Sequence, residues 1–415
     1  MAGFYFYGNL HRLPHHLMCR IPTFFLILSL LFFASFTPLL AQDNGLAPEV
    51  VDLNAEDVSF QLEAKLPYLK KPFISTAPKD RKDGIPVGKL YRHGPQMEIL
   101  MFAQEVAKES SNPRQGKTDS FLVCHEGKLI FESYFRRGRI NYPHYQMSIT
   151  KSYTAMALGR AIQLGHLTME DLHKPAVSFL KELNPKKFTK GADRITLHEA
   201  MQMSSGIRLE KEKINLLRKS PKQLLGQQQI QAYLQHSLPI PPAPRSFKYQ
   251  GSDPSITMQV LEAVVPRSSE DFIRKEFLAP LGIRNYAWQE DISGLPKSAA
   301  GSSMRSRDMI KMGLLVLNEG KWKGEQLVPA EFVKQSTQPL VKTYGNSSYG
   351  YFWWSEEVEV NGKTYQCKQG RGAGGQFLYM IPELELVAVV TAHNKGMGKM
   401  LKTLPQKLIP AFASK

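Results

Sequence analysis

Apolar residues are most concentrated between residues 149 and 164, where the only formal charges are Lys151 and Arg160. A helix drawn through this segment is apolar around most of its circumference, so we predict that it is buried in the core. Gly165 follows directly, and glycine readily adopts the left-handed conformation that ends helices. A lysine in the first turn of a buried helix is unusual, because burial disfavours the ammonium form.

Pairs of short apolar runs joined by turn residues predict two β-hairpins. Residues 120–125 and 128–134 are joined by a Glu-Gly pair, and residues 376–381 and 384–391 by a Pro-Glu pair. Residues 349–354 contain five aromatic side chains and predict a further strand.

Helical spacing is found on both sides of these strands. We predict helices over residues 97–107, over residues 306–317 with Ser306 as the cap, and over residues 397–412, while residues 166–289 carry mostly helical patterns. This order predicts an α+β fold in which one antiparallel β-sheet, built from both ends of the chain, is flanked by helices and interrupted by an inserted helical domain.

The chain has 415 residues, enough for two or three domains of ~100–200 residues each. We predict that residues 91–155 and 290–415 form the sheet domain and that residues 156–289 form the helical domain. Residues 42–90 are polar and contain several prolines, so we expect an extended lead-in.

The first 41 residues have a composition of their own. They contain Arg12 and Arg20 but no acidic residue, and residues 21–36 are nearly all apolar. With Ala41 at the cut, this pattern predicts a secretory signal peptide, with Met18 as an alternative start. The apolar run is shorter than the ~20 residues of a spanning helix, so an uncleaved membrane anchor is the less favoured alternative. We therefore expect a periplasmic or extracellular protein.

The formal net charge is +16, and basic residues cluster at 181–190 and 208–222. A solvated helical face is the favoured interpretation; the alternative is a surface that meets an anionic envelope polymer or membrane. No nucleic-acid-binding motif is present, and the export signal argues against such a partner. The oligomeric state is left open.

After removal of residues 1–41, the cysteines are Cys124 and Cys367, which we expect to be buried thiols. No His, Cys and carboxylate residues occur together at the spacing of metal ligands, so neither a metal nor an organic cofactor is expected.

Candidate chemistry begins at the start of the apolar helix. Residues three apart share a helix face, so Lys151 is expected beside the hydroxyl of Ser148. Burial and the positive end of the helix dipole both favour a neutral amine, which can accept a proton from Ser148. A serine needs such a base to act as a nucleophile. The alternative is that Ser148 only caps the helix and that Lys151 extends to water.

Two further segments fit an acyl-transfer site. Tyr249 follows a stiff proline-rich loop. A phenol beside an ammonium group is favoured as phenolate, so Tyr249 could share the proton transfer with Lys151. The alternative is that Tyr249 is a core tyrosine. Residues 370–376 contain four glycines before a strand, so the backbone can approach another group closely. The N–H groups of Ser148 and of Gly374 or Gly375 are the candidate oxyanion donors. The alternative is a glycine-rich bulge.

Ser148-x-x-Lys151, Tyr249 and the glycine-rich strand edge occur in the order found in the serine β-lactamase and penicillin-recognising superfamily. The sequence resembles its class C-like branch, which includes esterases, D-amino-acid peptidases and 6-aminohexanoate-dimer hydrolases, over about residues 85–400. The resemblance implies a β-lactamase/transpeptidase-like fold. It also implies that Ser148 is acylated, that Lys151 is the base, that Tyr249 relays protons, and that the N–H of Ser148 and one near Gly375 form the oxyanion hole.

The sequence departs from that pattern twice. In the second motif, Gly251 occupies the position where the family usually has Asn or Ser, and Ser252 or Asp253 could take over the role of that side chain. In the third motif, residues 372–374 read Gly-Ala-Gly, where the family often has a cationic residue before Thr-Gly. Both departures argue against an efficient β-lactamase, although Arg371 offers a charge nearby. Trp353, Trp354 and Tyr351 are candidate pocket walls.

We therefore expect an exported serine hydrolase that cleaves a small ester or amide. The alternatives are a penicillin-recognising sensor that is acylated without turnover, and a fold relative without chemistry that binds the envelope through its basic face.

Overall fold

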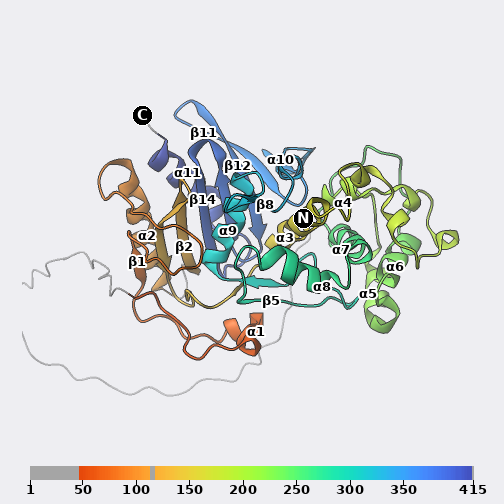
Figure 1. The fold of residues 1–415 in the computed structure, drawn as a ribbon, viewed down its shortest axis with the longest axis horizontal. Helices are drawn as coiled ribbons and strands as arrows, with labels where there is room; N and C mark the ends of the chain where they lie inside the picture. The colour runs from red at the N-terminus through yellow and green to blue at the C-terminus, as the bar shows by residue number, and fades with distance from the viewer. Residues whose placement is uncertain (1–45, 113–116, 414–415) are drawn as a thin grey trace, which may run out of the picture. The chain divides into compact units, whose positions relative to one another are not determined.

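The computed structural model describes residues 46–112 and 117–413. The predicted signal peptide lies outside the described residues. Within the described part of the chain, no helix is long and apolar enough to cross a membrane. This part folds as an α+β structure around a large antiparallel sheet, as predicted (Figure 1).

Nine strands form the central sheet in the order β1-β3-β2-β14-β13-β12-β11-β10-β9, and every neighbouring pair is antiparallel. Strands from the two ends of the chain meet where β2 pairs with β14 and Val123 lies opposite Ala388. The two predicted hairpins are confirmed as β2/β3 and β13/β14. The strand bounds are β1 Phe73–Ser75, β2 Thr118–His125, β3 Lys128–Tyr134, β9 Val341–Lys342, β10 Ser347–Tyr349, β11 Trp354–Val360, β12 Lys363–Gly372, β13 Gln376–Ile381 and β14 Leu386–Ala392.

The prediction of one aromatic strand over residues 349–354 is wrong. Tyr349 ends β10, Trp354 begins β11, and the four residues between them turn the chain. Phe352 adopts a left-handed φ of 61°, and the N–H of Gly350 donates to the carbonyl oxygen of Trp353 at 2.8 Å. The aromatic run is therefore a hairpin corner whose large side chains fill the core.

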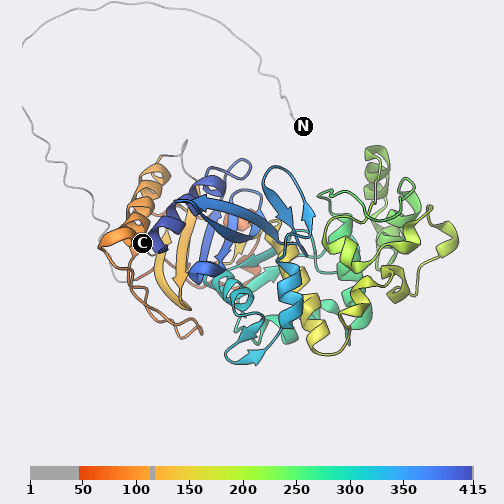
Figure 2. The same cartoon turned by 90° about the horizontal axis from the view of Figure 1, so that it is seen from above.

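Helices cover both faces of the sheet (Figures 1 and 2). α2 (Met97–Ser110) and α11 (Met400–Phe412) pack on one face, and α9 (Ser306–Leu317) and α3 (Ile149–Gln163) on the other. Both faces are buried, so the strands carry apolar side chains on both sides. In β2, Phe121 belongs to the core under α2 and α11, whereas Leu122 belongs to the core under α9 and α3. α9 begins where predicted, but Ser306 does not cap it, because its hydroxyl bonds with that of Ser120 at 2.7 Å instead.

Between α3 and the returning strands, the chain is mainly helical. α3 contacts both the sheet and α7, so the apolar core continues from the sheet into this region. The remaining elements are α1 Phe60–Glu63, β4 His144–Tyr145, α4 Leu197–Met201, α5 Lys211–Lys219, α6 Gln228–His236, α7 Ser252–Val264, α8 Ser269–Phe272, β5 Tyr286–Trp288, β6 Ser302–Met304, β7 Lys321–Trp322, β8 Glu325–Gln326 and α10 Ala330–Ser336. The predicted lead-in contains α1 and the edge strand β1, which local patterns did not reveal.

α3 matches its predicted bounds to within one residue. Its N-cap is Ser148, whose side chain makes no capping hydrogen bond, so the hydroxyl is left for other partners. Gly165 has a φ of 79°, and the N–H of the following His166 donates to the carbonyl oxygen of Ala161, which closes the helix as expected.

The contact between α9 and the sheet yields a stability prediction. A Cβ at Gly313 would lie 2.4 Å from Cγ1 of Val387, so Gly313→Ala should overpack this contact and lower the free energy of unfolding by about 1–3 kcal/mol in urea titrations. A Val387→Ala background removes the nearest methyl group and leaves only Cδ1 of Leu378, at 3.1 Å, in tight contact. There the same change should cost much less, because the main clash is gone and alanine favours the helix. Equal loss in both backgrounds would contradict this packing.

Candidate active site

The start of α3 brings Ser148 and Lys151 together. Nζ of Lys151 lies 2.9 Å from Oγ of Ser148 and donates to the carbonyl oxygen of Ala299 at 2.6 Å. Lys151 is only 4% exposed, so it does not extend to water. The residue before the serine, Met147, has a left-handed φ of 49°, and a non-glycine residue in that conformation stores backbone strain, which is often found at functional sites.

Burial lowers the pKa of Lys151 to about 7, and burial is the only cause of this shift. A substantial fraction of the amine is therefore neutral near pH 7, with its lone pair available to Ser148. The two side chains that the sequence predicts as nucleophile and base are therefore in direct contact.

Tyr249 completes this group. Its phenol is hydrogen-bonded to the side chain of Ser148. Nζ of Lys151 lies 4.8 Å from the centre of its ring. The ring packs against Trp354 and Tyr349, with centroids 5.7 and 6.1 Å away.

The expectation that Tyr249 is a phenolate is not supported. Burial raises its pKa, and this effect outweighs the hydrogen bond from Ser148 and the charge of Arg371, both of which lower it. Tyr249 is therefore a neutral phenol that can donate a proton while accepting another.

The residues of the second motif do not hold Lys151. Ser252 and Asp253 do not replace the missing side chain at Gly251, because the Ser252 hydroxyl donates to the Asp253 carboxylate at 2.8 Å. That carboxylate also accepts from Ser205 at 2.8 Å, and its pKa is raised to about 6 by burial. The carbonyl oxygen of Ala299 anchors the amine instead. A contact with a backbone carbonyl oxygen carries no residue-type signal, so residue patterns could not reveal it.

The glycines of β12 allow this strand to pass close to the start of α3. A Cβ at Gly370 would lie 3.2 Å from Cγ2 of Ile149, and one at Gly372 would lie 2.4 Å from the carbonyl oxygen of Gln146. Any larger residue at Gly372 would push the strand away from the residues that lead into Ser148. The close backbone approach expected of these glycines is present.

The N–H groups of Gly374 and Gly375 do not suit the predicted oxyanion role. That of Gly374 donates to the carbonyl oxygen of Gly396 at 2.8 Å, and that of Gly375 to Gly372 at 3.3 Å. Within the described residues, the N–H groups of Ser148 and Ala373 have no acceptor. Ala373 therefore replaces its two neighbours as the candidate second donor.

The predicted pocket walls separate into two groups. Trp353 is fully buried and belongs to the core, as does Tyr351, so neither lines a pocket. Trp354 is partly exposed; it packs on Tyr249, and Cζ of Arg371 lies 4.9 Å from its ring centre. Arg371 also pairs with Glu356 at 2.7 Å, so its charge is compensated.

A pocket of about 590 Å³ adjoins the site. It reaches the site at Ala299 and Gly251 and continues into the helical region, where Leu209, Ile214 and Leu217 line it. A Cβ built at Gly251 meets nothing within 4 Å, so the missing side chain leaves this part of the pocket wall open.

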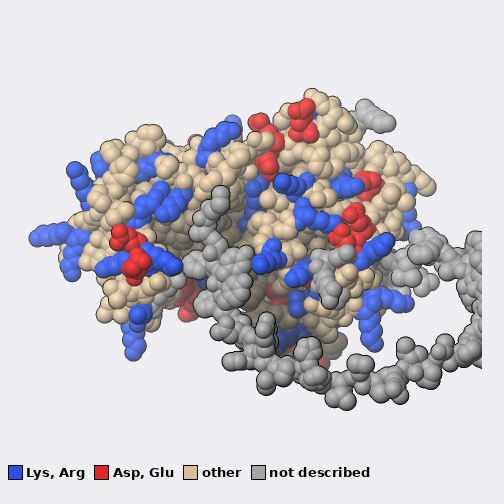
Figure 3. Space-filling model, turned by 180° about the vertical axis from the view of Figure 1, so that it is seen from behind, with Lys and Arg blue, Asp and Glu red and all other residues tan. Residues whose placement is uncertain are grey.

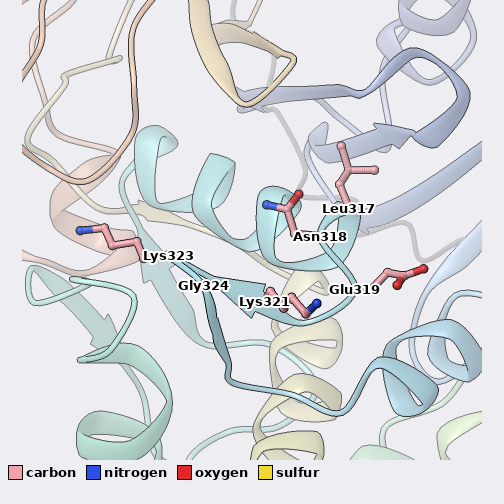
Figure 4. Close-up of a pocket in the computed structure, with 6 residues that line it drawn as sticks. All are labelled: Leu317, Asn318, Glu319, Lys321, Lys323 and Gly324. Carbon is pink, nitrogen blue, oxygen red and sulfur yellow. The ribbon is translucent and has the colours of Figure 1, made fainter.

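Other features lie away from this group. The hollow of about 400 Å³ shown in Figure 4 is lined by residues at the end of α9 and in the β7/β8 hairpin, none of which belongs to the site. Lys and Arg side chains are spread over the face in Figure 3 rather than gathered in one patch. Cys124 and Cys367 are buried free thiols, as expected, and burial raises the pKa of each to about 12.

The fold resembles those of several solved structures. A protein described as a 6-aminohexanoate-dimer hydrolase from Bacillus anthracis is 20% identical, with a TM-score of 0.60 over 88% of this chain and 97% of that one. EstCE1, a hydrolase with promiscuous acyltransferase activity, is 15% identical, with a TM-score of 0.59 over 77% and 98%. A class C β-lactamase mutant is 15% identical, with a TM-score of 0.58 over 76% and 96%.

A comparison with curated protein sequences finds no match. The Beta-lactamase family model matches residues 105–408, which include Ser148, Lys151, Tyr249 and the glycine turn. The chain therefore belongs to the Beta-lactamase family, a family of serine hydrolases with the β-lactamase fold.

Proposed function

We propose that this protein is an exported serine hydrolase that cleaves a small ester or amide through an acyl-enzyme on Ser148. The contact between Nζ of Lys151 and Oγ of Ser148, at 2.9 Å within a buried site, carries this proposal. A serine hydroxyl next to a neutral amine is an activated nucleophile.

In the first half of the reaction, the neutral amine of Lys151 takes the proton from Ser148 as Oγ attacks the substrate carbonyl. The carbonyl oxygen of Ala299 accepts a hydrogen bond from the resulting ammonium and stabilises it. The phenol of Tyr249 donates its proton to the leaving group and takes one from the ammonium of Lys151. Tyr249 is then again a neutral phenol, and Lys151 is again a neutral amine. Water then attacks the acyl-enzyme with the same groups acting in reverse.

The oxyanion of each tetrahedral intermediate is assigned to the N–H groups of Ser148 and Ala373. Two observations support this assignment: neither group has an acceptor within the described residues, and β12 passes against the start of α3. Donors fixed in the backbone need no reorganisation when the charge develops.

Electrostatics favour an ester or amide over a β-lactam. The carboxylate of a β-lactam needs a cation on the strand edge, but residues 372–374 provide none and Arg371 is paired with Glu356. The likeness to a protein described as a 6-aminohexanoate-dimer hydrolase and to EstCE1 supports the same choice.

Substitution of the nucleophile tests the proposal. We expect hydrolysis of p-nitrophenyl acetate by the wild type, little turnover of a chromogenic cephalosporin, and loss of ester turnover by at least about 10³-fold in Ser148→Ala. Ser152→Ala, one turn further along α3, is the matched control for local packing.

The outcome separates the alternatives. Ester turnover that survives Ser148→Ala would contradict the proposal, and fast cephalosporin turnover would contradict the assigned substrate class. A stable adduct on Ser148 by intact mass, without turnover, would instead identify an acyl-trapping sensor, a role that the missing polar side chain at Gly251 favours.

The lowered pKa of Lys151 predicts the pH dependence. Only the neutral amine accepts the proton, so kcat/KM for p-nitrophenyl acetate should rise with pH through about 7 and level off above it. Lys151→Ala should abolish the activity and with it the rise of kcat/KM with pH. Lys323→Gln, which changes an exposed lysine outside the site, should leave both the activity and this pH dependence unchanged. A flat profile between pH 5 and 9 would argue against Lys151 as the base.

The open space at Gly251 predicts acyl-chain selectivity. Gly251→Asn should narrow the way into the 590 Å³ pocket and lower kcat/KM for an octanoate ester about tenfold, while the acetate ester loses less than about threefold. Gly94→Asn is the control, because it adds the same side chain at an exposed glycine where a Cβ meets nothing within 4 Å, and asparagine is among the residues that best tolerate the left-handed φ of 67° found there. Equal losses for both esters would place the acyl chain elsewhere.

Export rests on residues 1–41, whose apolar run and Ala41 are typical of a signal peptide. N-terminal sequencing of the secreted product should begin at residue 42. Contact of the basic segments with an anionic envelope polymer stays a prediction.

A further inference from the structure

Three side chains that are far apart in the sequence meet next to β4, the strand that precedes Ser148. Glu63 ends α1, His144 begins β4, and His393 follows β14; one potential ligand atom from each lies within 4.8 Å of the others. Glu63 is 2% exposed and His144 is 6% exposed. Local sequence spacing did not predict this cluster, because the three residues are far apart in the chain.

One oxygen of Glu63 faces both imidazoles. Oε2 accepts a hydrogen bond from the N–H of Tyr145 at 3.0 Å, which fixes the carboxylate. Oε1 contacts Nδ1 of His144 and lies 3.8 Å from Nε2 of His393. Two nitrogens and one oxygen therefore converge on a common point.

The second nitrogen of each histidine is also held. Nδ1 of His393 bonds with Oδ2 of the buried Asp119 at 2.6 Å, and His144 is hydrogen-bonded to the side chain of Gln376. In turn, Oε1 of Gln376 accepts the N–H of Ala392 at 3.0 Å. Metal-binding histidines almost always have such an oriented outer partner, which fixes the tautomer and turns the other nitrogen toward the ion.

The cluster also contains two buried carboxylates. Glu63 and Asp119 are both buried, and within the described residues their only ion-pair partners are His144 and His393. The two imidazole rings lie close together, with centroids 5.0 Å apart. One divalent cation would balance the charge of both carboxylates.

We propose that Glu63, His144 and His393 bind a zinc ion through Oε1, Nδ1 and Nε2, respectively, with Asp119 and Gln376 orienting the two imidazoles. Nitrogen and carboxylate ligands at about 2.0–2.1 Å suit zinc, and tetrahedral ligand atoms then stand about 3.3 Å apart. The spacing of 3.8 Å between Oε1 of Glu63 and Nε2 of His393 is close to this value, whereas Oε1 and Nδ1 of His144 are in direct contact and would have to separate to admit the ion. His393 is 17% exposed and provides a way in.

The ion would act as a structural clip for the catalytic site. β4 runs from His144 toward Ser148, and Gln376 and His393 flank the turn that carries Ala373. The N–H of Asn394, next to His393, donates to Gly374 at 2.8 Å. Zinc would thus tie α1 to both segments that bear the proposed oxyanion donors, without touching the substrate.

Metal analysis of the untagged full chain tests this proposal. We expect one zinc per chain in the purified protein by mass spectrometry. After treatment with EDTA and dialysis, calorimetry should give one site with a Kd in the micromolar range or tighter. Zinc should raise the melting temperature of the stripped protein by about 3 °C or more, because binding favours the folded state.

Variants locate the site. Glu63→Gln and His393→Gln should bind zinc at least tenfold more weakly, and Asp119→Asn, which removes only an outer partner, about 10–100-fold more weakly. His93→Gln, a change at an exposed histidine, should bind as the wild type does. His11, His15 and His16 remain in every variant, so binding through them would survive the substitutions.

Two results would overturn the proposal. One is a stripped wild type that shows no binding below about 100 µM and no zinc-dependent melting shift, which needs no variant to fold. The other is wild-type affinity in Glu63→Gln and His393→Gln. Ester hydrolysis by Ser148 is measured separately, so failure of the zinc site would leave the proposed hydrolase intact.

Discussion

The site depends on the burial of one lysine. An exposed lysine has a pKa near 10.4 and would be an acid at neutral pH. Inside the core, with Ser148 and the carbonyl oxygen of Ala299 as its polar partners, the pKa of Lys151 falls to about 7. The sheet, α3 and the segment after β5 must all be in place for this desolvation, so the fold itself makes the base.

The opposite wall is built from backbone rather than side chains. The glycines of β12 let the strand approach α3, and the turn after it uses the N–H groups of Gly374 and Gly375 to hold its own shape. The remaining N–H, that of Ala373, is left for a ligand. With Arg371 neutralised by Glu356, this edge offers hydrogen-bond donors without a net cation. That combination suits a developing oxyanion better than a substrate carboxylate.

Both walls of the site lie next to the cluster of His144 and His393. One histidine lies on the strand that enters α3, and the other follows the strand beside the glycine turn. A rigid connection here would fix the spacing between the two proposed oxyanion donors. Positional precision in such sites comes from contacts outside them, because the donors are single N–H groups with no side chain to hold them.

Local patterns were sufficient for α3, for the hairpins β2/β3 and β13/β14, and for the pairing of Ser148 with Lys151, because helical and strand periodicities and i, i+3 neighbours are properties of short segments. The placement of Trp353 in the core and the bend at Phe352 depended on packing. The contact of Lys151 with Ala299 runs through a carbonyl oxygen that every residue possesses. His393 and Asp119 are 274 positions apart and meet only because β14 pairs with β2. The sequence by itself determined most of the helices and hairpins and the neighbourhood of Ser148 and Lys151. Only the tertiary structure decided which strand-edge N–H has no acceptor among the described residues, which carbonyl oxygen anchors Lys151, and where the two histidines meet, because long-range contacts and backbone groups leave no trace in residue type.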